Sequence, residues 1–169
     1  MFRKLKREAD FLIAHSGMIG FSAFVCCFGG ILLWVNGTNI WHILRSGALP
    51  SDAVSVTRIF LLWLLTYGLC GTSLALLLLQ GRLFCRNNLF LTAFSVCCAI
   101  YLLQLVWYAV FFCTHLLFFA LFILSLAFLL TILLFFLVRH SFLLLRLLLL
   151  AITLVELYFI YFNLTFYLG

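Results

Sequence analysis

The sequence predicts an all-α integral membrane protein, a bundle of five transmembrane helices in a single membrane domain, residues 1–169. Two observations predict this class. Apolar residues make up 68% of the chain, against ten Lys and Arg and four Asp and Glu, whereas soluble chains have about 45–50% apolar and about 25% charged residues. The apolar residues also fall into five runs of about 20 residues or more, the length that a helix needs to cross a bilayer.

The first predicted span covers residues 11–35 and follows a basic segment, residues 3–7. A cleaved signal peptide is the alternative, but its apolar core has only about 7–15 residues, so this run is too long. The polar residues 36–58 follow, and they contain the only proline, Pro50. We expect this segment to be a long exposed loop.

The other four spans are separated by short polar breaks. They are predicted at residues 59–79, 89–112, 116–138 and 144–168. Backbone groups in hydrocarbon must be hydrogen-bonded within their own segment, and none of these runs alternates with period two. The spans are therefore predicted to be helices and not the strands of a barrel.

The basic residues are distributed unevenly between the two sides that five helices define. Eight of the ten fall on the side of the N terminus, and only Arg45 and Arg58 fall on the other side. Because positive charge is enriched on the cytoplasmic side, this bias predicts a cytoplasmic N terminus in the cell membrane, with the first loop and the C terminus outside. The bias also accounts for the net charge of +6, so we expect no nucleic-acid partner.

The seven cysteines do not have the spacing of a metal or redox site. They include two adjacent pairs, Cys26-Cys27 and Cys97-Cys98, and neighbouring thiols cannot easily bridge or share a tetrahedral metal. The four histidines are scattered, with no acid at ligand spacing. We expect no metal and no obligatory cofactor.

Glu156 is the only acid inside a predicted span. A charge at this depth is costly, so such residues usually face the bundle interior. Thr153, Asn163 and Tyr167 lie on the same stripe of the helix. The stripe is either a packing contact between helices or a polar wall of an internal pocket.

Aromatic residues with hydrogen-bonding groups lie near the middle of two other spans. Trp63 and Tyr67 share one helix face, and Gln104 precedes Trp107 by one turn. Membrane proteins usually place Trp and Tyr at the interfaces instead. These side chains either form the core or line a ligand pocket, and close helix contacts are expected at the small residues Gly68, Gly71 and Ala75.

Three segments, in this order along the chain, resemble the motifs of a known membrane-protein family. They are Trp63-Leu-Leu-Thr-Tyr67-Gly-Leu-Cys-Gly71-Thr-Ser73, Gln104-Leu-Val-Trp107-Tyr-Ala109-Val-Phe111-Phe112 and Tyr158-Phe159-Ile160-Tyr161-Phe162-Asn163. They resemble the W-x-x-x-[YF]-x-x-x-G-x-S, N-x-x-W-x-P-x-F-F and F-A-T-Y-L-N patterns of the TspO/translocator protein family, the tryptophan-rich sensory proteins or peripheral benzodiazepine receptors. The resemblance covers roughly residues 34–167.

The resemblance implies a TspO-like bundle and a membrane receptor or sensor. Its pocket would bind porphyrin, heme or a similar flat hydrophobic ligand, and the chain would form a homodimer in the lipid bilayer. With the polar residues in mid-membrane, it predicts a ligand-binding set of Trp41, Trp63, Tyr67, Gln104, Trp107, Phe111, Glu156, Phe159 and Asn163, in which Trp41 closes the pocket from the first loop.

The sequence also departs from the family pattern. Ala109 replaces the proline of the third span, Gln104 replaces its asparagine, and the tryptophan- and proline-rich loop motif is reduced to Trp41 and Pro50. We therefore expect no enzymatic activity. Two alternatives stay open, namely a small transporter that uses Glu156 as a proton or cation site, and a membrane enzyme that degrades porphyrins.

Overall fold

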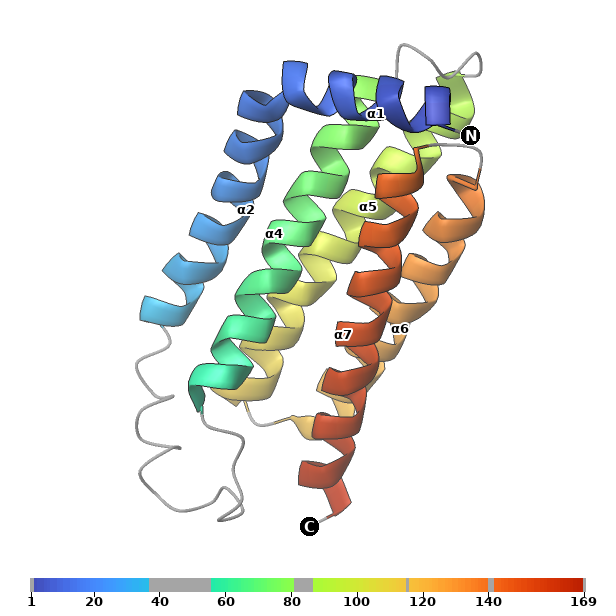
Figure 1. Ribbon diagram of the computed structural model, residues 1–169. Helices are drawn as coiled ribbons and strands as arrows, with labels where there is room; N and C mark the ends of the chain where they lie inside the picture. Colours follow the sequence, from blue (N-terminus) through green and yellow to red (C-terminus); the bar gives the residue numbers. More distant parts are fainter. Residues whose placement is uncertain (1, 37–55, 81–86, 115, 140–141, 169) are drawn as a thin grey trace.

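The computed structural model describes residues 2–36, 56–80, 87–114, 116–139 and 142–168, and every element within these ranges is a helix (Figure 1). The elements are α1 (Phe2–Ala14), α2 (Ser16–Asn36), α4 (Val56–Gln80), α5 (Asn87–Tyr108), the π-helix η1 (Ala109–Thr114), α6 (Leu117–Leu137) and α7 (Leu143–Leu168).

Helices α4, α5, α6 and α7 are each long and apolar enough to cross a membrane, and the bent pair of α1 and α2 gives a fifth crossing if it is taken as one broken span. The four unbroken spans have 21 to 23 residues and so extend about 32–35 Å, against a hydrocarbon thickness of about 30 Å. The predicted multi-pass helical membrane class is confirmed. The helices begin and end within a few residues of the last four predicted spans.

The first span differs from the single helix that we predicted over residues 11–35. Helices α1 and α2 are bent by 67° at His15, and α1 lies across one end of the bundle (Figure 1). The Ser16 hydroxyl donates a hydrogen bond to the Ile13 carbonyl at 3.0 Å, next to Gly17, and Ser and Gly residues are common sites of kinks. The charged residues along α1 also favour a position at the membrane surface over one in hydrocarbon.

Two contacts attach α1 to the start of α7. The Glu8 side chain is buried, and its Oε2 accepts a hydrogen bond from the backbone N–H of Leu143 at 3.2 Å. The ring of Phe11 meets that of Phe142 edge-on, with centroids 5.1 Å apart. Leu143 is the first residue of α7, whose N–H has no partner within its own helix. Glu8 therefore caps α7 from another element.

The spanning helices form a closed ring, with α4 against α5, α5 against α6, α6 against α7 and α7 against α4, while α2 packs along the outside of α4. Helices α2 and α4 approach closely at Gly71, where a Cβ atom would lie only 2.7 Å from the Ser22 carbonyl oxygen and 2.8 Å from the Ala23 Cα. The Ser22 hydroxyl donates to the Gly71 carbonyl at 2.8 Å. The contact expected at Gly71 is confirmed.

Candidate functional site: a buried aromatic and polar cluster

A polar triad joins three helices at the centre of the bundle. Glu156 lies midway along α7, and its Oε1 accepts a hydrogen bond from the Gln104 amide of α5 at 2.8 Å. The Thr131 hydroxyl of α6 lies 3.1 Å from the same oxygen. All three side chains are 0% exposed. We call these residues the polar triad.

Not every group of the polar triad is satisfied. Within the part of the chain that the structure describes, Oε2 of Glu156 and Oε1 of Gln104 are buried and have no hydrogen-bond partner. The Thr131 hydroxyl also lies 3.0 Å from the Ala127 carbonyl, and because a hydroxyl has one proton it donates to only one of its two acceptors at a time. The triad therefore holds more acceptors than donors.

A second polar contact joins the same three helices closer to the C-terminal end of α7. With its amide oriented so that the oxygen faces the two donors, Asn163 of α7 accepts hydrogen bonds from the Trp107 indole N–H of α5 and the Leu121 backbone N–H of α6, both at 3.2 Å. The Asn163 side chain is fully buried. Asn163 follows Glu156 by seven residues, about 10 Å along the helix.

Aromatic rings fill the space around these two polar contacts. Trp63 of α4 stacks on Tyr108 of α5, with centroids 4.4 Å apart and an interplanar angle of 29°, and it meets Tyr67 edge-on at 4.5 Å. The Trp107 ring lies 4.9 Å from that of Phe159 and 5.5 Å from that of Phe111. These separations are typical of favourable aromatic pairs. We call the six residues Trp63, Tyr67, Trp107, Tyr108, Phe111 and Phe159 the aromatic cluster.

The structure brings the predicted site residues together from α4, α5, η1 and α7. Eight of the nine are described, and each of the eight is buried. Trp41 lies outside the described residues. In the structure these eight side chains contact one another or their immediate neighbours, so they form a packed centre.

Three residues of this centre were not predicted from the sequence. Thr131 completes the polar triad, Tyr108 provides the ring that stacks on Trp63, and Tyr101 meets Tyr67 edge-on at 5.5 Å while its hydroxyl donates to the Cys26 carbonyl at 3.3 Å. One signal that points to Thr131 is its spacing on α6. The buried residues of that helix recur every three or four positions, at Ala120, Leu124, Ala127, Thr131 and Leu134.

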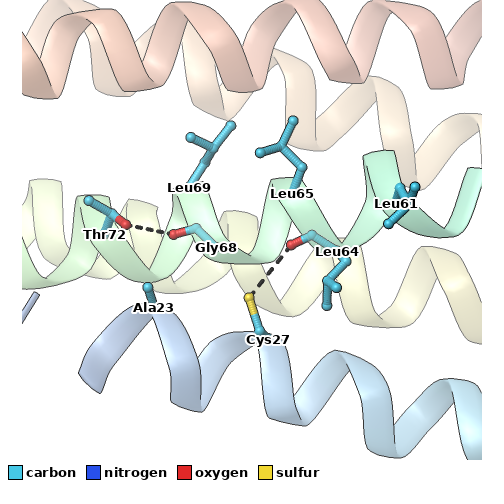
Figure 2. A pocket seen from close by; sticks show the side chains of 8 residues that line it. All are labelled: Ala23, Cys27, Leu61, Leu64, Leu65, Gly68, Leu69 and Thr72. Atoms are coloured by element: carbon cyan, nitrogen blue, oxygen red, sulfur yellow. Dashed lines mark hydrogen bonds between the residues drawn. The ribbon is translucent and has the colours of Figure 1, made fainter. Parts of the chain in front are cut away.

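An open groove with a volume of about 390 Å³ lies on the opposite face of α4, between α2 and α4. Figure 2 shows the side chains that line it. Its polar groups are already bonded, since the Thr72 hydroxyl donates to the Gly68 carbonyl at 2.8 Å and the Cys27 thiol to the Leu64 carbonyl at 3.7 Å. The protons of both groups are therefore engaged by the backbone. Its lining residues are Ala23, Cys27, Leu61, Leu64, Leu65, Gly68, Leu69 and Thr72.

The fold and the site define a multi-pass helical membrane protein with an aromatic and polar centre. No family model, curated protein or solved structure matches the chain. The chemistry of the centre therefore carries the functional argument.

Proposed function

We propose that the chain is a membrane receptor, a divergent member of the TspO/translocator protein family, that binds flat hydrophobic ligands of the tetrapyrrole class inside the bundle. One observation carries the proposal. Side chains that lie up to a hundred residues apart in the sequence, from Trp63 to Asn163, meet in one buried centre that combines stacked rings with an amide and a carboxyl group. Ligand sites typically combine apolar walls with a few polar groups that fix orientation.

The aromatic cluster offers the contacts that a planar ligand needs. Trp63 and Tyr108 present nearly parallel faces, so a flat ring system can take the place of one ring and stack on the other. The cluster occupies the half of the bundle toward the first-loop end of α4 and the C-terminal end of α7. A ligand would enter from that end. Trp41, which the resemblance predicts to close the pocket, lies outside the described residues.

Backbone geometry next to the cluster supports the same site. The chain leaves α-helical geometry at Ala109 and continues as the π-helix η1, and π-helical turns often occur at functional sites. Ala109 is the position at which the family pattern has a proline. The widened turn places Phe111 against Trp107 and Phe162.

Titration of the detergent-purified protein with protoporphyrin tests the proposal. The Soret band and tryptophan quenching should both saturate below about 100 μM, which corresponds to about 5–6 kcal/mol of binding free energy. Trp107→Leu should weaken binding about fivefold, since it removes a stacking face worth about 1 kcal/mol. The matched control Phe122→Leu, at a position that is 63% exposed toward lipid, should leave affinity unchanged. A signal that rises linearly without saturation would overturn the proposal.

A further inference from the structure

The polar triad holds a carboxyl group that has no cation beside it among the residues that the structure describes. The groups that interact with Glu156 from neighbouring helices are the Cys70 thiol of α4, Gln104 of α5 and Thr131 of α6, and none of them is basic. On its own helix the nearest basic residue is Arg146, ten positions earlier and about 15 Å along the axis. A carboxylate without a counter-charge at the bilayer centre costs several kcal/mol.

The polar triad also has too few hydrogen-bond donors for its buried acceptors. Oε2 of Glu156 and Oε1 of Gln104 are fully buried and have no partner within the described ranges. An ionised carboxyl oxygen and an amide oxygen both only accept hydrogen bonds. A proton on the carboxyl removes its charge and turns one of its oxygens into a donor, so the triad gains the donor that its buried acceptors lack.

We propose that Glu156, Gln104 and Thr131 form a proton-binding site at the centre of the membrane, and that this site holds one proton at neutral pH. The orientation of the Gln104 amide favours a proton over a metal ion. Gln104 presents its N–H, and not its oxygen, to the Glu156 carboxyl at 2.8 Å, and cations such as Ca²⁺ and Mg²⁺ bind oxygen ligands. The inference depends on the triad alone and is independent of the tetrapyrrole proposal.

The site would link the protonation of Glu156 to the packing of α5, α6 and α7. Loss of the proton would leave a charge in hydrocarbon, and it would change the contacts that hold these three helices together. The same helices meet again at Asn163, Trp107 and Leu121. A proton taken up or released at the triad is therefore placed to alter the aromatic cluster.

Infrared spectroscopy of the intact protein in lipid vesicles tests the site directly. The chain has only four acidic residues, so the carbonyl stretch of a protonated carboxylic acid can be assigned by substitution. At pH about 7, where freely exposed carboxyls are ionised, the wild type should show this band and shift it in D₂O. Glu156→Gln, which keeps the shape of the side chain, should lose the band completely, whereas the matched control Glu8→Gln should retain it.

Two further measurements keep the test decisive. Gln104→Leu, which removes the partner amide and keeps the carboxyl, should shift the band because the acid loses a hydrogen bond. Exchange of potassium for sodium in the buffer should leave the band unchanged. Absence of the band at neutral pH, its survival in Glu156→Gln, or its loss on addition of sodium would each overturn the inference.

Discussion

The Gln104 amide nitrogen lies 2.8 Å from the Glu156 carboxyl oxygen, and this hydrogen bond joins α5 to α7 where both side chains are fully buried. Gln104→Leu should lower the free energy of unfolding by about 0.6 kcal/mol, the average for side-chain hydrogen bonds between membrane helices, and by at most about 1.7 kcal/mol. Denaturation in mixed detergent and lipid micelles measures the change.

A double-mutant cycle with Glu156→Leu isolates this bond from the other effects of each substitution. We expect a coupling free energy between positions 104 and 156 whose magnitude equals the loss of stability expected for Gln104→Leu. Gln80→Leu serves as the control, because Gln80 is also buried but lies at the far end of α4. Equal coupling in both cycles would contradict the contact.

The cap from Glu8 predicts that α1 stabilises the bundle. Glu8→Ala should lower stability by about 1 kcal/mol, because the first N–H of α7 loses its acceptor and a favourable charge near the helix N terminus. Asp10→Ala, on the exposed face of α1, should have little effect. Thermal denaturation followed by circular dichroism compares the two variants, and equal changes would count against the cap.

The close approach of α2 and α4 predicts that alanine is tolerated at one glycine and not at another. Gly71→Ala places a Cβ atom 2.7 Å from a backbone oxygen and 2.8 Å from a backbone carbon, neither of which can move without shifting a helix. It should destabilise the protein by about 1–3 kcal/mol. Gly20→Ala meets no atom within 4 Å and should be neutral or slightly stabilising, since alanine favours a helix. Thermal denaturation followed by circular dichroism measures both effects. An unchanged stability in Gly71→Ala would contradict the close packing of α2 on α4.

The Asn163 amide should control the environment of the Trp107 indole. Asn163→Leu removes the acceptor of the indole N–H, so stability should fall by about 1 kcal/mol and the emission of Trp107 should move to shorter wavelength. Thr165→Ala is the control, because the hydrogen bond that Thr165 makes among the described residues stays within its own helix turn, to the Phe162 carbonyl at 2.7 Å. An unchanged emission maximum in Asn163→Leu would show that this bond is not formed.

Hydropathy predicted the spans because lipid imposes the same requirement on each crossing, namely enough apolar residues in a helix. The bend at His15 was not predicted. The basic residues before it indicate which side of the membrane the chain begins on, but they do not tell whether they belong to a loop or to a helix on the membrane surface. The structure shows a helix there, tied to α7 by Glu8.

Polar and aromatic residues in mid-membrane each predicted most of the buried centre, but for different reasons. Glu156, Gln104 and Asn163 were found because each is rare at that depth and needs a partner inside the bundle. Tyr108 was missed because lipid accepts aromatic rings as readily as the core does, as the exposed rings of Phe119 and Phe122 show. Thr131 was missed because a hydroxyl can bond its own helix backbone and needs no partner elsewhere.

The most direct test of the proposed function compares two proteins with a single tryptophan each. One retains Trp107 and carries Phe at the other three tryptophan positions, and the other carries Phe at all four and the reporter Phe122→Trp on the lipid-facing side of α6. Protoporphyrin should quench Trp107 saturably, with one ligand per chain, while the reporter at position 122 responds only in proportion to porphyrin dissolved in the lipid. Proportional quenching of both tryptophans would contradict a ligand site inside the bundle.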